Sequence, residues 1–306
     1  MTELTDMVPS RQLEEMLSFV PSDFADPSAD FEQVRATMKP FHGHPVPPHV
    51  EIREASLGGV PVGWCEDTTK ACERGVVFHC HGGGLVSCPL HDYFFYGAML
   101  SEQLGLRVVL PDYRLAPEHH FPAAHNDCFA AYRGLLDSGV DPARLLVAGD
   151  SCGGGLGLST LVRARDEGLP LPAGFVSISG WFDLSVANPV EEGRDPFLSA
   201  PWVRNRGLDY TAGRVPLDDP LVSPAYADLT GLPPLYLPVG QFDTLREGVV
   251  TTAANAIGAG VSVQLESWPG MVHGWQGLVT VGVPEAVAAF ERMRAFVDLV
   301  LPASER

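Results

Sequence analysis

The sequence has few positive charges and no long hydrophobic run. Lys and Arg together number 20 against 38 Asp and Glu, which gives a formal net charge of −18. This charge disfavours binding to nucleic acid or to an anionic membrane, and it makes a neutral substrate a better fit than a strongly anionic one. No apolar stretch approaches the roughly 18 residues that a membrane span needs. The composition therefore predicts neither a nucleic-acid partner nor a membrane partner.

The N-terminus and the cysteines lack the signals of secretion and of metal binding. Residues 1–6 include acids and no apolar core of a signal peptide, so we expect a cytoplasmic protein. The six cysteines lie in the first half of the chain and form no Cys-x-x-Cys pair. We expect them to be free buried thiols and expect no metal site.

The chain is organised around residues 145–156, where an apolar run meets a glycine-rich corner. Ser151 lies at the centre of Gly149-x-Ser151-x-Gly153. This pattern is typical of a tight strand-turn-helix corner, in which glycines two residues away avoid a backbone clash and the serine hydroxyl is exposed. A glycine-rich turn with a solvated serine would have the same sequence pattern. Residues elsewhere in the chain are therefore needed to distinguish a catalytic serine from an ordinary turn.

Strands and helices alternate along most of the sequence. Several predicted strands are apolar throughout, as expected for a parallel sheet buried on both faces. This alternation predicts a doubly wound, mostly parallel α/β sheet flanked by helices. The predicted strands are two around Gly58-Gly59 within 50–65, then 76–80, 107–110, 145–148, 175–179, 235–239 and 261–266, and the predicted helices are 91–104, 123–136, 154–167, 247–259 and 284–301.

Two segments do not fit this alternation, and we predict that they form a helical cap. Residues 1–48 contain two amphipathic helix candidates, 11–20 and 30–38, the second with Ser28 as a possible N-cap. Residues 181–234 are proline-rich, with a helix candidate at 200–210, and a connection of this length is usually a lid or a functional insertion. The catalytic domain would then comprise 49–180 and 235–306.

A serine nucleophile needs a histidine base and an acid that orients the histidine. In enzymes with this serine corner the chain order is Ser, acid, His, and His273 is the one histidine after Ser151. Asp243 closely follows a predicted strand and is the preferred acid. Asp183, just after an earlier strand, is the alternative.

A glycine run follows the predicted strand 76–80. In His81-Gly82-Gly83-Gly84 the backbone N–H groups have no side chains in their way, which suits an oxyanion hole, and the N–H of Cys152 would complete it. A phosphate-binding loop is the alternative, but no accompanying nucleotide motif supports it.

These motifs together resemble the bacterial hormone-sensitive-lipase-like carboxylesterases, the family IV esterases of the α/β-hydrolase superfamily. The resemblance implies an α/β-hydrolase fold with an N-terminal cap, hydrolysis of short to medium acyl esters, and no cofactor. It implies Ser151, Asp243 and His273 as the triad, Gly82, Gly83 and Cys152 as oxyanion donors, and an internal pair of Arg114 with Glu118. The motifs that carry it are 81–84, 112–118, 149–154, 195–198, Asp243-x-Leu245-Arg246 and His273-Gly274.

Three positions depart from the family pattern. Cys152 stands where the family usually has alanine, which leaves its backbone N–H available but adds a side chain behind the nucleophile. Gly248 replaces a second acid after Asp243, and Trp275 replaces a phenylalanine after His273-Gly274. We expect a lost contact near the triad acid and a reshaped alcohol side of the pocket.

The sequence thus predicts a serine carboxylesterase that hydrolyses short- to medium-chain neutral esters through an acyl-enzyme. A lactone hydrolase would use the same triad, and a non-catalytic ligand receptor on the same fold is the alternative from another class. Phe41, Phe197, Leu198 and Trp202 either line the pocket or form ordinary cap core. The apolar helix candidate near the C-terminus, 285–301, could contribute to a homodimer.

Overall fold

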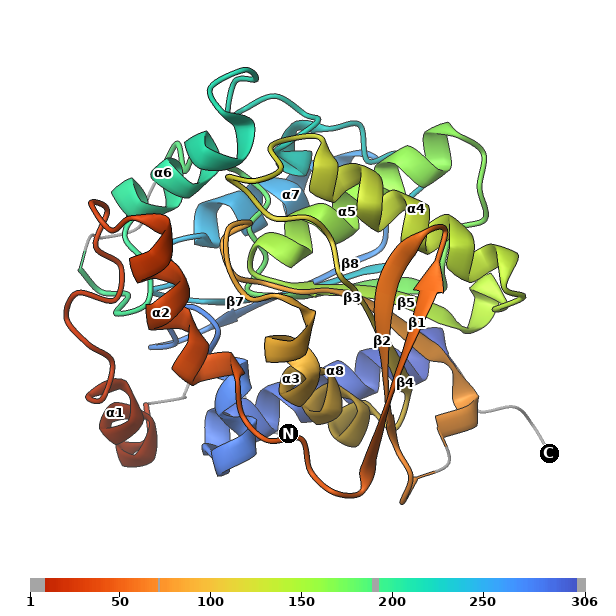
Figure 1. Ribbon diagram of the computed structural model, residues 1–306, viewed down its shortest axis with the longest axis horizontal. Helices are drawn as coiled ribbons and strands as arrows, with labels where there is room; N and C mark the ends of the chain where they lie inside the picture. The colour runs from red at the N-terminus through yellow and green to blue at the C-terminus, as the bar shows by residue number, and fades with distance from the viewer. Residues whose placement is uncertain (1–8, 71, 189–192, 302–306) are drawn as a thin grey trace.

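The computed structural model describes residues 9–70, 72–188 and 193–301 of the chain. A single eight-stranded sheet runs through the molecule in the order β1-β2-β4-β3-β5-β6-β7-β8, and all its pairs beyond β4 are parallel (Figure 1). The strands are β1 (Val50–Leu57), β2 (Val60–Asp67), β3 (Val76–Cys80), β4 (Arg107–Pro111), β5 (Leu145–Asp150), β6 (Gly174–Ile178), β7 (Leu235–Gly240) and β8 (Val263–Trp268).

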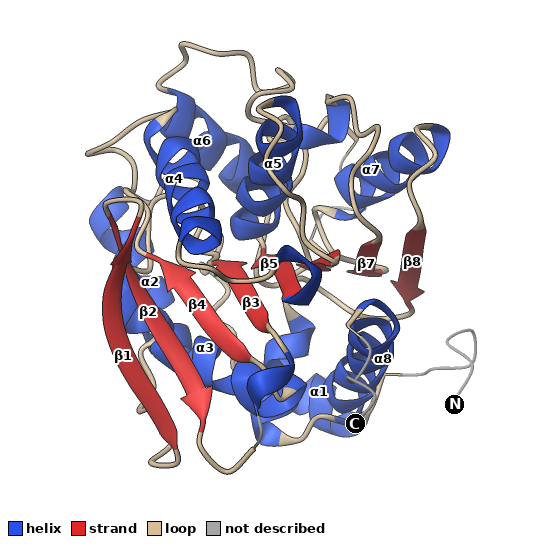
Figure 2. Cartoon of the chain, turned by 90° about the vertical axis from the view of Figure 1, so that its right-hand side faces the viewer, coloured by secondary structure: helices blue, strands red, loops and turns tan. Residues whose placement is uncertain are grey.

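Helices cover both faces of this sheet. Figure 2 shows α4, α5 and α7 on one face and α3 and α8 on the other. The α-helices are α1 (Arg11–Leu17), α2 (Phe31–His42), α3 (Leu90–Leu104), α4 (Ala123–Asp137), α5 (Cys152–Asp166), α6 (Ala200–Thr211), α7 (Arg246–Gly258) and α8 (Pro284–Val300). Among the residues with an assigned position, no helix combines the length and apolar character that a bilayer crossing requires.

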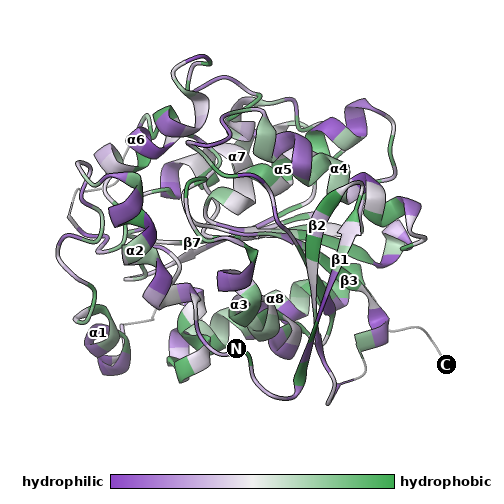
Figure 3. Ribbon diagram, viewed as in Figure 1, coloured by the Kyte–Doolittle hydropathy of each residue, from purple (hydrophilic) through white to green (hydrophobic). Residues whose placement is uncertain are grey.

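The central strands are buried along their whole length, which explains why they read as continuous apolar runs. Every residue of β3, β5, β6 and β7 is buried, whereas β1 is exposed at several positions. Figure 3 shows many hydrophilic residues in α1, α2 and α6, away from these strands. The predicted α/β sheet is confirmed, and the sheet edge at the ends of β3, β5 and β7 carries the candidate site.

The N-terminal segment and α6 lie side by side, although about 170 residues separate them (Figure 1). The rings of Phe24 and Phe197 meet edge to face at 5.6 Å, and Asn205 Nδ2 donates a hydrogen bond to the carbonyl of Pro27 at 2.8 Å. Their division from the sheet as a separate cap, with boundaries at 48, 181 and 234, stays a prediction.

Several predicted boundaries move for identifiable reasons. Asp30 rather than Ser28 caps α2. The N–H of Gln33 donates a hydrogen bond to the Asp30 carboxylate, and the N–H of Asp30 donates one to Gln33 Oε1. Helix α5 begins at Cys152, not at Gly154, despite three successive glycines. Those glycines are required by packing, since a Cβ at Gly153 would lie 1.9 Å from the carbonyl oxygen of Cys80.

Candidate active site

Ser151 occupies the sharp corner between β5 and α5. Its backbone angles are φ 51° and ψ −126°, outside the regions that most residues prefer. The corner is held from β6, because the N–H of Ser151 donates to the carbonyl of Ile178 at 3.0 Å and its carbonyl accepts from Trp181 at 2.7 Å. A Cβ at Gly149 would lie 2.2 Å from the carbonyl oxygen of Gly153, so glycine is needed there. The predicted tight strand-turn-helix corner is therefore present, with Ser151 at its apex.

His273 and Asp243 come together from the loops after β8 and β7. His273 Nδ1 lies 3.2 Å from Asp243 Oδ1 and 3.3 Å from Oδ2, and the Asp243 side chain is fully buried. The N–H of Leu245 donates to Asp243 Oδ1 at 2.9 Å and fixes the carboxylate. Burial lowers the pKa of the His273 imidazole, but the charge and the hydrogen bond of Asp243 outweigh burial, so the pKa is raised overall.

Asp183, the alternative acid, serves a local turn instead. Its carboxylate accepts hydrogen bonds from the N–H groups of Ser185 and Ala187 and from the Ser185 hydroxyl. It also packs against Gly248, where a Cβ would lie only 3.1 Å from the Cβ of Asp183. Glycine at position 248 thus leaves room for Asp183, and Asp243 is the acid that meets His273.

The glycine run after β3 is anchored by Asp150, the residue before Ser151. The Gly82 N–H donates to Asp150 Oδ1 and to the Tyr93 hydroxyl oxygen, both at 3.0 Å. Gly83 and Gly84, not Gly82, line the cavity in front of Ser151. Of the two glycines predicted as oxyanion donors, Gly83 faces the cavity, whereas the Gly82 N–H is already engaged.

The Asp150 carboxylate is the centre of a buried polar cluster that the sequence analysis missed. His79 Nε2 donates to Oδ1 at 2.9 Å, and the Tyr93 hydroxyl donates to Oδ2 at 2.6 Å. Burial raises the pKa of Asp150, but these hydrogen bonds and the nearby histidines outweigh burial and keep its pKa below the ordinary value. His79 lies in an otherwise apolar, fully buried strand, and the sequence of β3 does not indicate that its side chain reaches across to β5.

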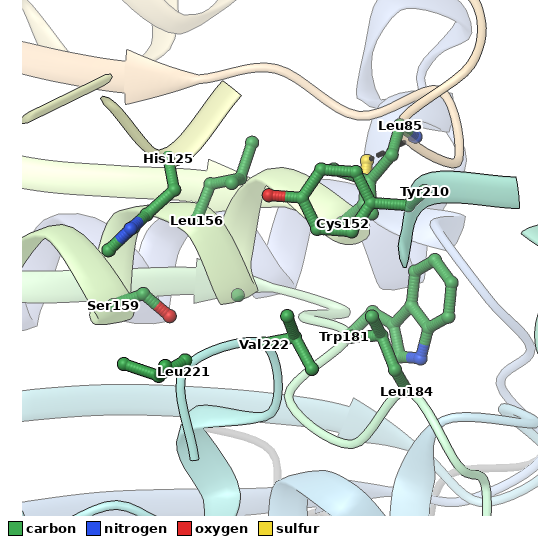
Figure 4. Close-up of a pocket in the computed structure, with 11 residues that line it drawn as sticks. Leu85, His125, Cys152, Leu156, Ser159, Trp181, Leu184, Tyr210, Leu221 and Val222 are labelled. Atoms are coloured by element: carbon green, nitrogen blue, oxygen red, sulfur yellow. Dashed lines mark hydrogen bonds between the residues drawn. The ribbon is translucent and has the colours of Figure 1, made fainter. Parts of the chain in front are cut away.

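Cys152 contributes a side chain as well as a backbone N–H. Its Sγ accepts a hydrogen bond from the N–H of Leu85 at 3.3 Å, which ties the start of α5 to the end of the glycine run (Figure 4). Beside it lies a void of about 10 Å³, bordered by Trp181 and Tyr210. Burial raises the pKa of the Cys152 thiol to about 12, so the thiol stays protonated and is a poor nucleophile. All six cysteines are free and buried, as predicted.

A cavity of about 460 Å³ opens in front of Ser151 and His273. Its wall is mostly apolar, with contributions from the N-terminal helices, α3, the segment before α6 and the loop after His273. The predicted pocket residues Phe197, Leu198 and Trp202 are part of this wall, whereas the side chain of Phe41 lies outside the described residues. The apolar and aromatic lining residues are Met16, Leu17, Phe19, Val20, Phe24, Met38, Tyr93, Phe95, Tyr96, Met99, Ile178, Phe197, Leu198, Trp202, Leu278 and Val281.

Two other expectations are wrong. Trp275 does not line the cavity, because its fully buried ring packs against Trp268 with the ring centroids 5.7 Å apart. Arg114 does not pair with Glu118: Arg114 binds Asp127 through two hydrogen bonds of 2.8 Å.

Glu118 instead pairs with Arg35 of α2, at 2.7 and 2.8 Å. This pair links α2 to the loop after β4, which neither local sequence nor spacing indicated. Within the ranges that the structure describes, no group of three or more His, Cys, Asp and Glu side chains is arranged to hold a metal ion.

Comparisons with known proteins agree with this geometry. The profile of the α/β-hydrolase fold family matches residues 77–277. An acetyl-hydrolase of Streptomyces hygroscopicus is 38% identical over 78% of this chain and 81% of its own, and the carboxylesterase NlhH of Mycobacterium tuberculosis is 35% identical over 74% of each. A solved esterase of the bacterial hormone-sensitive lipase family superposes with a TM-score of 0.87 at 32% identity, covering 96% of this chain and all of that one. The chain therefore belongs to the bacterial hormone-sensitive-lipase-like esterases of the α/β-hydrolase fold.

Proposed function

We propose that the protein is a serine carboxylesterase that hydrolyses short- to medium-chain neutral esters through an acyl-enzyme. The observation that carries this proposal is that Ser151 and His273 border the same apolar cavity while Asp243 holds the imidazole. The two curated relatives named above are an acetyl-hydrolase and a carboxylesterase, and the apolar wall and the size of the cavity suit a small uncharged ester.

In the proposed reaction His273 takes the proton of Ser151 as the serine oxygen attacks the ester carbonyl. Asp243 holds the imidazole with its proton on Nδ1 and stabilises the imidazolium that forms. His273 then protonates the departing alcohol and activates a water molecule, which releases the acid from Ser151.

When the serine oxygen attacks, negative charge develops on the carbonyl oxygen of the ester, and hydrogen-bond donors at the cavity wall must stabilise it. The engagement of the Gly82 N–H by Asp150 favours Gly83, Gly84 and Cys152 as these donors. Gly82 would then position the loop rather than contact the substrate. Each donor of this kind contributes about 2.7–4 kcal/mol to the stability of the transition state.

A series of chromogenic esters from acetyl to dodecanoyl, measured beside a panel of lactones, tests the proposed function. We expect turnover that is highest at short or medium acyl chains, because the cavity of about 460 Å³ has a mostly apolar wall. Faster hydrolysis of lactones would reassign the substrate class while keeping the triad. Binding of these compounds without turnover would contradict the esterase and favour a receptor.

The pH profile should report the state of His273. Because the neutral imidazole is the base, kcat/KM is expected to rise as His273 loses its proton. The raised pKa of His273 places the midpoint of this rise above the ordinary histidine value of about 6.5. The measurement is kcat/KM for one soluble ester between pH 5 and 9, and a flat profile would exclude His273 as the base.

A further inference from the structure

Asp195 lies in the turn that leads into α6, and its carboxyl group is directed to the backbone of the active site. Its side chain accepts a hydrogen bond from the N–H of Phe197 through Oδ1 and one from the N–H of Thr244 through Oδ2, each at 3.0 Å. Thr244 directly follows the triad acid, Asp243. The buried carboxyl therefore joins two loops that are 49 residues apart.

A second link joins the same two loops. The Thr244 hydroxyl donates a hydrogen bond to the carbonyl of Leu198 at 3.0 Å. Phe197 and Leu198 both belong to the wall of the catalytic cavity. This part of the wall is thus fastened to the loop of the triad acid from both sides of the turn.

Asp195 is also close enough to the triad to act on it through its charge. The groups that face it are Asp243, whose negative charge opposes ionisation of Asp195, and His273, which favours ionisation. Burial raises the pKa of Asp195 to about 7, and Asp243 adds to this effect. The charged groups that face His273 are Asp243, Asp195 and Asp150, and all three favour the protonated imidazole.

We propose that Asp195 is a positioning residue of the active site. It fastens the wall formed by Phe197 and Leu198 to the loop of Asp243, and it places a second carboxyl near His273. This inference rests on the proposed function, because it concerns the base and the substrate wall of the same site.

The test is Asp195→Asn, measured as kcat/KM against pH for several acyl chain lengths. The amide removes the negative charge that Asp195 carries above its pKa of about 7. His273 should then lose its proton more readily, and the acid limb of the profile, the rise of kcat/KM with pH, should move to lower pH. The amide keeps only one acceptor oxygen for the two N–H groups, so the wall should loosen. We expect kcat/KM for the preferred ester at pH 8 to fall about 10- to 100-fold and the preference among acyl chains to broaden.

Two further variants separate charge from packing. Asp183→Asn is the matched control, because Asp183 is equally buried, accepts backbone N–H groups in the same segment and does not meet His273. It should leave both the acid limb and the acyl preference as in wild type. Thr244→Val removes only the hydrogen bond to Leu198, so it should broaden the acyl preference without moving the acid limb.

The proposal would be overturned if the acid limb of Asp195→Asn coincided with that of wild type. It would also be overturned if the acid limb of Asp183→Asn moved by as much as that of Asp195→Asn. A wild-type acyl preference in both Asp195→Asn and Thr244→Val would overturn it as well. If Asp195→Asn does not fold, Thr244→Val decides instead, and a wild-type acyl preference in that variant would count against the proposal. Lack of ester turnover by wild type would defeat the proposed function itself, a result distinct from all of these.

Discussion

Replacing Ser151 with alanine is expected to lower kcat for the preferred ester on the order of 10⁵- to 10⁶-fold. The reason is that the corner between β5 and α5 presents the Ser151 hydroxyl to the cavity that His273 shares, and alanine would leave the proposed base, His273, with no nucleophile to activate. The fold should persist, because the corner is held by backbone hydrogen bonds to Ile178 and Trp181 rather than by the serine side chain. Steady-state kinetics and a thermal melt of the same preparation would measure both.

Ser159→Ala is the matched control for this variant. Ser159 is a buried serine on α5, the helix that directly follows Ser151, and it borders the small void behind the corner instead of the catalytic cavity. Its loss should leave kcat within a few-fold of wild type. A sulfonyl fluoride should form a covalent adduct with the wild-type protein and with Ser159→Ala, but not with Ser151→Ala. Mass spectrometry of the intact proteins would detect the adduct as an increase in mass. Esterase activity in Ser151→Ala within tenfold of wild type would contradict the assignment.

Cys152 is the neighbouring group that could be mistaken for the nucleophile. Its Sγ lies behind the corner, bonded to the N–H of Leu85, and is not part of the catalytic cavity. The raised pKa of this thiol also keeps it protonated at neutral pH. A thiol reagent is therefore not expected to inhibit the enzyme at the rate of a serine-directed reagent.

The sheet could be predicted because its strands are buried on both faces and are bounded by turns. The runs at β3, β5 and β7 are mostly apolar, and the hairpin of β1 and β2 turns at Gly58 and Gly59, both with positive φ. The sequence predicts that α5 begins at Gly154, two residues after its actual start, because glycine has low intrinsic helix propensity. The helix starts at Cys152 because only glycines can approach the carbonyl of Cys80 and the backbone of Trp181 so closely.

Contacts between distant segments explain what the sequence did not indicate. Three successive glycines look equivalent in a sequence, and the contact of Gly82 with Asp150 decides which of their N–H groups face the cavity. In the same way, Arg114 and Glu118 are four residues apart, yet each finds a partner on a different helix. The sequence shows Asp195 only as part of a family motif. Its hydrogen bond with Thr244 could not be predicted, because the two residues are 49 positions apart and come together only when the loop after β7 is folded.

Asp243→Asn is expected to lower kcat/KM by about 10⁴-fold. An asparagine amide can donate to His273 Nδ1, which selects the tautomer with its proton on Nε2, and that tautomer cannot accept the proton of Ser151. The remaining activity should also have its acid limb at lower pH, because the negative charge of Asp243 is the main cause of the raised pKa of His273. Both effects would be measured as kcat/KM across pH 5 to 9.

Asp183→Asn is also the control for Asp243→Asn, because Asp183 and Asp243 are the two candidates for the acid that orients His273. Both carboxylates follow strands of the same sheet, and both are buried. Asp243 alone meets the imidazole, while Asp183 accepts from Ser185 and Ala187 in its own turn. Asp183→Asn should therefore lower thermal stability and leave kcat/KM within a few-fold of wild type. If Asp183→Asn lost about 10⁴-fold and Asp243→Asn little, the acid would have to be reassigned, because the orientation of His273 would then depend on β6 and not on β7.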